Sequence, residues 1–150
     1  MNTFISSGFP IHRGRRLRSK KGVRSLVAES SLIPNNLVMP YFIREDNDAG
    51  SHSLISGLKR FSINELLSEL EVIIKHGIVA IALFPKIPEE KKTNIGNEAW
   101  SEKNLIVRAL KLIKKNFPEL IIICDVALDP YTVSGHDGIV DENGHIMNDS

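Results

Sequence analysis

Three apolar runs, separated by two amphipathic stretches, dominate the hydrophobic pattern of the chain. The runs span Leu37–Ile43, Ile78–Phe84 and Ile121–Leu128, and each has the length of a strand. They are apolar throughout rather than alternating, which is typical of strands in a parallel sheet covered on both faces. Pro40 inside the first run favours a place at an edge, an end or a bulge.

The two intervening stretches carry apolar residues at helical spacing. The first opens with Ser62-Ile63-Asn64-Glu65, which has the form of a capping box, and stops before Gly77. The second spans Glu102–Asn116 and ends ahead of a proline. The order is therefore strand, helix, strand, helix, strand, with crossovers long enough for parallel pairing. This order predicts an α/β fold with a parallel sheet.

The two ends of the chain have a different character. Residues 1–22 contain Pro10 and Gly14 and predict an extended arm, while residues 23–150 are predicted to form the folded domain. We expect a short helix over Val23–Glu29, and a small hairpin over Ile139–Ser150 that turns at Glu142-Asn143-Gly144.

Composition narrows the class of protein. The chain has 150 residues, 42% hydrophobic and 25% charged, which is ordinary for one globular domain. The single cysteine, Cys124, excludes an intrachain disulfide and favours the reducing cytoplasm. No apolar run has the length of a membrane span, and the first residues lack the apolar core of a secretory signal, so we expect no membrane association.

Charge is unevenly distributed although the net charge is only +1. Residues 1–28 contain basic side chains and no acidic one, including Arg15, Arg16 and Arg18. A basic arm could contact phosphate or RNA, but no nucleic-acid-binding motif follows it. Pairing with an acidic surface on a neighbouring subunit is at least as well supported, and we expect no nucleic-acid partner.

The third apolar run ends in a cluster of polar residues. Strand geometry would align Asp125, Ala127 and Asp129 if the strand continued through Asp129, and Asp137 would return after a turn at Gly135. Carboxylates at the end of a buried strand suit Mg²⁺ or a substrate amine. The alternative is that Asp129 and Asp137 only cap turns, whereas a carboxylate within an apolar strand, at Asp125, requires a partner.

Three further side chains belong to the same segment. His136 could shuttle a proton, although a loop histidine is more often solvated. Tyr131 could donate to a substrate or pack its ring over the strand end. Cys124 is interpreted as a small core residue, because burial makes a thiol unreactive. The residues alone therefore define an α/β enzyme, or part of one, with an acidic site at the strand ends.

The sequence Asp129–Gly138, D-P-Y-T-V-S-G-H-D-G, resembles porphobilinogen synthase, also called 5-aminolevulinate dehydratase. The similarity extends to Arg15–Arg18, Asn36–Ile43, Ala80–Pro85 and Gly96–Ala99, and covers residues 12–150. It implies the first three βα units of a TIM (β/α)₈ barrel, preceded by an arm through which the family forms homo-octamers. It also implies a lyase that condenses two 5-aminolevulinate molecules to porphobilinogen with loss of water, in tetrapyrrole and haem biosynthesis.

The resemblance also assigns roles to residues. Asp125 matches the active-site aspartate, and Asp125, Asp129 and Asp137 would be the catalytic carboxylates. Asp125 and Asp129 would position or deprotonate a substrate amine, and Asp137 would support them through a cation or water. Asp125 and Tyr131 would bind substrate, and Asp129 and Asp137 would hold a metal ion. Zinc-dependent members have cysteines at the positions of Ala127, Asp129 and Asp137, so this chain is similar to the aspartate-bearing subgroup that uses Mg²⁺ or monovalent ions without catalytic zinc, and we expect Mg²⁺.

The lysines that form Schiff bases in the family have no counterpart among these 150 residues. Lys86 and Lys92 lie on a strand-end loop but do not match them. We therefore expect this chain alone to be inactive. The alternative is a non-catalytic remnant, or an interaction module that acts through the basic arm.

Overall fold

The structure, a computed structural model, describes residues 14–48 and 58–147, which fall into two compact units divided between Leu32 and Ile33. The first unit contains the 3₁₀ helix η1 (Arg16–Arg18) and the helix α1 (Lys21–Leu26), and neither helix buries a residue. The boundary predicted after residue 22 lies within this unit and stays a prediction. The first 13 residues of the predicted arm and the last three of the predicted hairpin lie outside the described residues.

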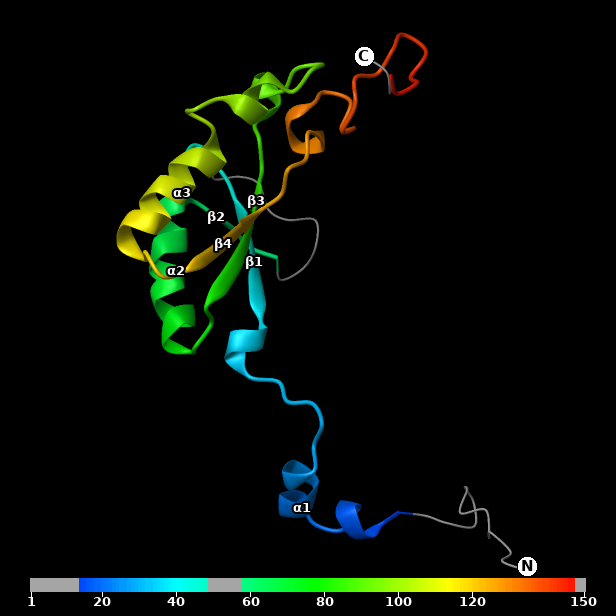
Figure 1. The fold of residues 1–150 in the computed structure, drawn as a ribbon. Coiled ribbons are helices and arrows are strands. Elements are labelled where there is room, and N and C mark those ends of the chain that lie inside the picture. The colour runs from blue at the N-terminus through cyan, green and yellow to red at the C-terminus, as the bar shows by residue number, and fades with distance from the viewer. Residues whose placement is uncertain (1–13, 49–57, 148–150) are drawn as a thin grey trace, which may run out of the picture. The chain divides into compact units, whose positions relative to one another are not determined.

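The second unit is built on a parallel sheet with the strand order β2-β1-β3-β4 (Figure 1). This arrangement confirms the predicted α/β class. No helix among the described residues is long and apolar enough to cross a membrane. The elements are β1 (Val38–Ile43), β2 (Arg60–Phe61), α2 (Ile63–Lys75), β3 (Ala80–Pro85), α3 (Leu105–Asn116) and β4 (Ile121–Cys124).

Local signals fix the ends of both long helices. The Ser62 hydroxyl accepts the Glu65 N–H at 3.3 Å and the Glu65 carboxylate accepts the Ser62 N–H at 2.8 Å, so the predicted capping box opens α2. Gly77 follows α2 with a φ of 85°, a left-handed conformation that only glycine adopts at little cost. The predicted start of α3 at Glu102 is wrong by three residues, because Asn104 provides the cap by accepting the Ile106 N–H at 2.7 Å.

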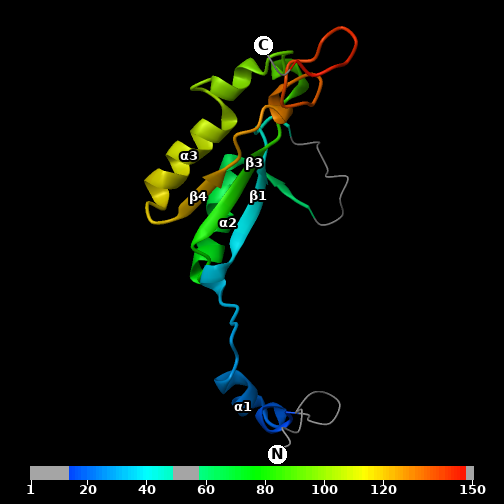
Figure 2. The ribbon, with the colours of Figure 1, turned by 45° about the vertical axis from the view of Figure 1, so that its right-hand side comes forward.

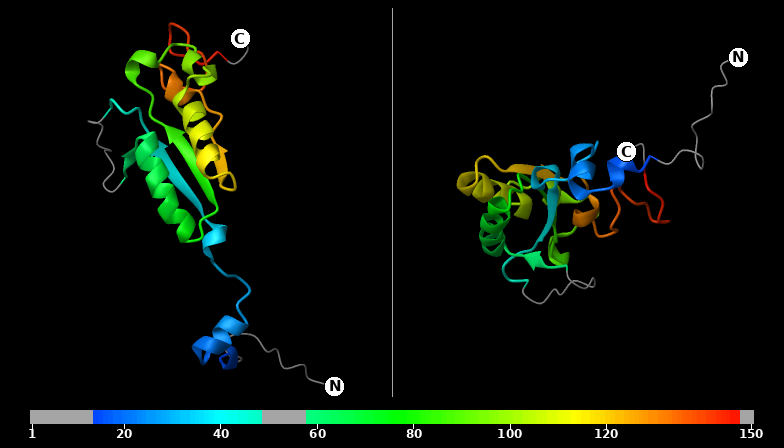
Figure 3. Two further views of the ribbon diagram at one scale, coloured as in Figure 1. Left: turned by 90° about the vertical axis from the view of Figure 1, so that its left-hand side faces the viewer. Right: turned by 90° about the horizontal axis from the view of Figure 1, so that it is seen from below.

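Both α2 and α3 cover the same face of the sheet (Figures 2 and 3). Their apolar stripes meet the strand residues whose side chains point toward them, and each fully buried side chain of this kind contributes about 1.5–3 kcal/mol. The main buried side chains of this core are Tyr41, Ile43, Leu66, Leu70, Ile81, Leu83, Leu105, Ala109 and Ile113.

The opposite face of the sheet is uncovered in the described residues, so the prediction that both faces are covered is wrong here. Strand register places its side chains in rows. One row contains Val38 and Ile121, which are 47% and 55% exposed, and a second row contains Ile123, which is 48% exposed. Phe42 stacks on Phe84 in a third row, with ring centroids 5.4 Å apart. Rows of apolar side chains pointing away from the helices are the arrangement found inside an α/β barrel.

Two strand predictions require correction. The strand predicted over Ile121–Leu128 ends at Cys124, since its register would place Pro85 of β3, which has no N–H, opposite Val126. The short strand β2 was not predicted, because two residues give no periodic pattern. Pro40 is tolerated in β1 because the pairing with β2 covers only Phe42 and Ile43, leaving one edge of β1 unpaired at the proline.

Candidate active site

The loops after β3 and β4 come together at the carboxyl ends of the strands (Figure 1). A pocket of about 600 Å³ lies there. Parallel α/β folds bind their ligands at this edge, because every polar strand-end loop projects there. The loop after β4 supplies a continuous wall, residues 125–131. The remaining lining residues are Phe42, Arg60, Leu83, Phe84, Pro85, Lys86, Ala99, Asn104, Ile106 and Val107.

Asp125, Ala127 and Asp129 all line this pocket, although not as one face of a strand. The predicted alignment is wrong because β4 has already ended and Asp129 begins the 3₁₀ helix η5 (Asp129–Tyr131). Both carboxylates are exposed, and neither makes a hydrogen bond or an ion pair within the described residues. The expected buried partner of Asp125 is therefore absent from that part of the chain, and its oxygens are available to a ligand.

Asp137 holds the loop together. Its Oδ1 accepts the N–H of Leu128 at 2.7 Å and the N–H of Asp129 at 3.0 Å. These backbone donors, that of Asp129 first, hold the pKa of the Asp137 carboxyl below its ordinary value. Asp137 thus caps η5 from eight and nine residues further along the chain, and it does not line the pocket.

Tyr131 is the buried residue of η5. Its side chain is buried, and burial raises the pKa of its hydroxyl, which a hydrogen bond with the Asn104 side chain partly offsets. Gly96, whose φ is 69°, packs against Tyr131 and Thr132, and an added Cβ would lie 3.4 Å from Thr132 Cγ2. The loop after β3 therefore fixes Tyr131, consistent with a packing role and with its place in the pocket wall.

Sequence reasoning missed Asn104. This side chain is 1% exposed and lines the pocket. Its Nδ2 donates to the Glu98 carbonyl oxygen at 2.8 Å, while its Oδ1 caps α3 through the Ile106 N–H. One side chain thus joins the loop after β3, the start of α3 and Tyr131. Its signal was an asparagine placed immediately before an apolar helical stripe, which is a typical N-cap.

His136 and Cys124 are the remaining candidates. The His136 side chain is exposed and does not line the pocket, so its role stays a prediction, while its backbone carbonyl oxygen accepts a hydrogen bond from the Thr132 hydroxyl at 2.9 Å. Cys124 packs against the core, and burial raises the pKa of its thiol, so the prediction of a small core residue is confirmed.

The loop lysines are paired. Lys86 Nζ lies 2.6 Å from an Asp48 oxygen, although Lys86 also lines the pocket, and Lys92 Nζ lies 2.7 Å from a Glu89 oxygen. Each ammonium group is thus held against a carboxylate of the described residues and is not positioned to attack a substrate carbonyl. Neither lysine is therefore suited to imine formation in this arrangement.

The carboxylates of Asp125, Asp129 and Asp137 offer oxygen atoms, which is the ligand type that Mg²⁺ prefers. Asp129 and Asp137 are adjacent, because Asp137 accepts the Asp129 N–H. Within residues 14–48 and 58–147, no group of three or more His, Cys, Asp or Glu side chains is placed to hold a metal ion. The chemistry of the donor set fits Mg²⁺ held by one or two carboxylates and water, but not a site made of three protein ligands.

A parallel sheet with its helices on one face, apolar rows on the other and a pocket with two carboxylates at the strand ends is the architecture of part of an α/β barrel. Comparison with known proteins assigns the chain to a family. The family model described as delta-aminolevulinic acid dehydratase matches residues 11–150, and the chain belongs to this family.

Individual proteins with the same description are similar to this chain over most of its length. The chloroplastic delta-aminolevulinic acid dehydratase of Glycine max is 40% identical over 151 residues, which is 99% of this chain and 37% of the relative. The enzyme of Chlamydia pneumoniae is 39% identical over 138 residues, which is 91% of this chain and 41% of the relative. The chain therefore spans about two fifths of the length of these relatives.

A solved structure matches the fold. The crystal structure of delta-aminolevulinic acid dehydratase (porphobilinogen synthase) from Toxoplasma gondii, in complex with the reaction product porphobilinogen, superimposes with a TM-score of 0.84 and 38% identity. The match covers 95% of this chain and 41% of that chain. The sheet and its helices thus correspond to the N-terminal part of that TIM-barrel fold.

Proposed function

We propose that these residues form the N-terminal part of a porphobilinogen synthase, which condenses two 5-aminolevulinate molecules to porphobilinogen with loss of water. The observation that carries the proposal is the strand-end pocket with two unpaired carboxylates, Asp125 and Asp129, in a chain of this family. Both substrates carry an amine, which an unpaired carboxylate can orient through a charge-assisted hydrogen bond.

Asp125 and Asp129 act on the same group in this proposal. Together they orient the amine of one substrate, and one of the two carboxylates accepts a proton from that amine as it becomes a nucleophile. Tyr131, fixed by Asn104 and Gly96, shapes the wall beside them. The covalent imine chemistry requires an unpaired lysine, and Lys86 in the pocket wall is ion-paired with Asp48. This chain alone is therefore proposed to make no porphobilinogen.

The test uses two proteins. The purified 150-residue chain, verified by mass, is assayed for the pyrrole product, and turnover would refute the claim of inactivity. A chimera then joins residues 1–150 to the remaining part of the Chlamydia pneumoniae relative. We expect the chimera to make porphobilinogen, and Asp125→Asn to lower its kcat at least about a hundredfold, the lower end of what a general acid–base residue contributes.

The matched control is Asp46→Asn, because Asp46 is also an exposed carboxylate but does not line this pocket. It should leave kcat within about twofold, as expected of a surface substitution outside the site. Equal effects of the Asp125 and Asp46 changes in an active chimera would refute the assigned role of Asp125.

Mg²⁺ is the proposed ion, held by Asp129 and the free oxygen of Asp137 together with water. It would supply positive charge that steadies the loop and a nearby substrate group. Isothermal titration of this chain with Mg²⁺ should show binding that Asp129→Ala removes and Asp46→Ala leaves unchanged. Binding that survives Asp129→Ala would show that Asp129 is not a ligand of the ion.

The proposed partner is a further copy of the same chain, contacted through the arm in a homo-octamer, and the proposed location is the cytoplasm. In the described part of the first unit, which contains the end of the arm, Leu17, Leu26 and Leu32 are 58%, 85% and 77% exposed, which supports docking onto another surface. Light scattering should show smaller assemblies for the triple variant Arg15→Ala, Arg16→Ala, Arg18→Ala. An unchanged mass would remove these arginines from the interface.

A further inference from the structure

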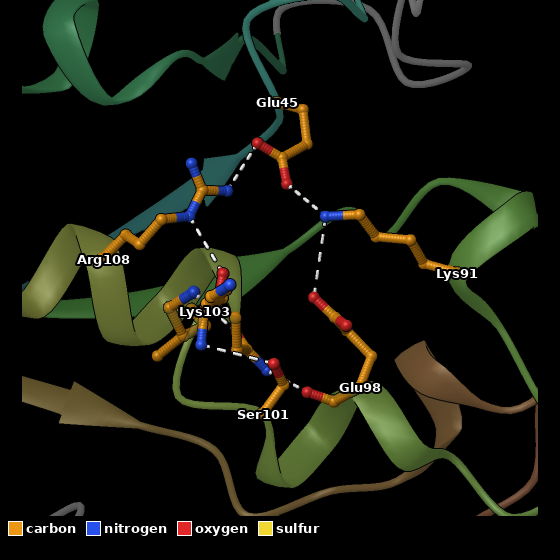
Figure 4. A network of polar contacts seen from close by, with 8 residues as sticks. Glu45, Lys91, Glu98, Ser101, Lys103 and Arg108 are labelled. Carbon is orange, nitrogen blue, oxygen red and sulfur yellow. Dashed lines mark hydrogen bonds and ion pairs between the residues drawn. The ribbon is translucent and has the colours of Figure 1, made fainter.

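The Glu45 carboxylate joins three segments of the chain near the carboxyl ends of the strands (Figure 4). Glu45 follows β1, Lys91 lies on the loop after β3, and Arg108 lies on α3. Glu45 Oε1 accepts from Lys91 Nζ at 2.8 Å, and Glu45 Oε2 accepts from an Arg108 amino group at 2.5 Å. Lys91 also lies 3.6 Å from a Glu98 oxygen on the same loop. Both oxygens of one side chain are thus engaged by cations that are 46 and 63 residues away in the sequence.

The geometry of this network is more restrictive than that of an ordinary surface ion pair. The Glu45 side chain is only 15% exposed. Arg108 Nε donates to the Lys103 carbonyl oxygen at 3.0 Å, so its planar guanidinium is held at two sides. Burial alone would raise the pKa of Glu45, but the hydrogen bonds from Arg108 and Lys91 outweigh it and keep that pKa below its ordinary value. Glu45 therefore holds both cations in its ionised form.

The tethered loop also reaches the candidate site. Thr93 N–H donates to the Tyr131 carbonyl oxygen at 3.2 Å, and Thr93 accepts the Val133 N–H at 3.1 Å. Gly96 packs against Tyr131, and Ala99 lines the pocket. A shift of this loop would therefore move the wall formed by the loop after β4, although Glu45 itself does not line the pocket.

We propose that Glu45 is a positioning residue, whose carboxylate clamps the loop over residues 86–101 to α3 and to the end of β1 and thereby sets the shape of the candidate active-site pocket. The positioning of the loop stands on the geometry alone, while its value for catalysis rests on the proposed function. The expected occupant of the pocket stays the amine-bearing substrate of that function.

The first test measures the loop without any substrate. Hydrogen exchange of backbone amides in residues 93–101 is compared between the wild-type chain and Glu45→Gln, which keeps the shape and removes the charge. Gln keeps one acceptor oxygen but turns an NH₂ group toward the other cation, so one charge-assisted hydrogen bond and the negative charge are lost, which should speed exchange in this segment by about tenfold or more. Trp100, the only tryptophan, is 64% exposed on this segment, so its fluorescence anisotropy should fall in the same variant.

Glu90→Gln is the matched control, because Glu90 is exposed on the same loop and forms no ion pair in the described residues. Its exchange should stay within about twofold of wild type, as for an ordinary surface substitution. Amides of α2 serve as an internal reference, since their unchanged protection shows that the fold is intact. Equal exchange in the Glu45→Gln and Glu90→Gln variants would overturn the proposal.

If Glu45→Gln prevents folding, Lys91→Met provides the second test. It removes the link to the loop and leaves the pair between Glu45 and Arg108. It should also loosen residues 93–101, and unchanged exchange would overturn the proposal.

Activity is measured separately in the chimera, where Glu45→Gln should lower kcat/KM by about tenfold and Glu90→Gln should not. A loosened loop with unchanged kcat/KM in an active chimera would overturn the catalytic part of the proposal. A loosened loop in a chimera that makes no porphobilinogen would refute the proposed function and leave the clamp established.

Discussion

Replacing Asn104 by alanine should destabilise the chain by about 2 kcal/mol. Truncation removes the N-cap of α3, which costs about 1 kcal/mol. It also leaves the Glu98 carbonyl oxygen without its donor at 2.8 Å, which costs about another 1 kcal/mol at a partly buried position. The two contributions come from different atoms of one side chain that is 1% exposed, so both are lost together. The hydrogen bond between Asn104 and the Tyr131 hydroxyl is lost with them, so about 2 kcal/mol is a lower bound.

The assay is urea unfolding of dilute protein followed by far-ultraviolet circular dichroism. With a slope of about 2 kcal/mol per molar urea, the midpoint should fall by roughly 1 M. Asn104→Asp separates the contributions, because a carboxylate still accepts the Ile106 N–H and favours a helix N-terminus but has no donor for Glu98. It should lose only about half as much stability as Asn104→Ala.

Asn116→Ala is the control, because Asn116 is an exposed asparagine at the other end of α3 and bonds only to the Leu112 carbonyl oxygen within the helix. Its loss should stay below about 0.5 kcal/mol. A similarly small loss for Asn104→Ala, or equal losses for the alanine and aspartate variants, would refute the assignment of the two contributions.

Three further outcomes follow from the structure. Tyr41→Phe should change stability by no more than about 1 kcal/mol in the same assay, since the buried Tyr41 hydroxyl has no close hydrogen-bond partner among the described residues, and burial, followed by the nearby Glu69 carboxylate, raises its pKa to about 12. A large loss of stability would contradict this. Because the folded-state pKa of Asp137 is lowered, its stabilisation is complete above the unfolded-state pKa of about 4 and disappears as the pH falls through the lower folded-state pKa. Asp137→Asn should therefore flatten the stability profile below about pH 4, and an unchanged profile would remove this contribution. The apolar rows on the sheet predict self-association at neutral pH, which a monomer mass by light scattering would disprove.

Whether a feature could be predicted from the sequence depended on how far apart its interacting residues lie along the chain. The Ser62 cap and the left-handed Gly77 depend on neighbouring residues, so both were predictable. The end of β4 depends on Pro85 of another strand, and the capping of η5 by Asp137 depends on how the loop folds back. Neither of these leaves a local pattern in the sequence.

The same distinction separates the site residues that the sequence revealed from those that it did not. The acidic segment was found because its residues are contiguous, and the family resemblance supplied their roles. Asn104 and the cations around Glu45 were missed because single polar residues between helices and loops have no periodicity, and their partners are identified only by the fold.

One face of the sheet is uncovered in the described residues, so the stability of this unit depends on the concentration of anything that binds this face. Any segment that binds the rows containing Val38, Ile121 and Ile123 in the folded state, and not in the unfolded one, stabilises the fold by an amount that rises with the logarithm of its free concentration above Kd. At a free concentration of 100 times its Kd, such a segment adds about 2.7 kcal/mol, a large share of the stability of a small domain. The melting temperature of this unit is therefore expected to depend on concentration, and to report how well its apolar rows are covered.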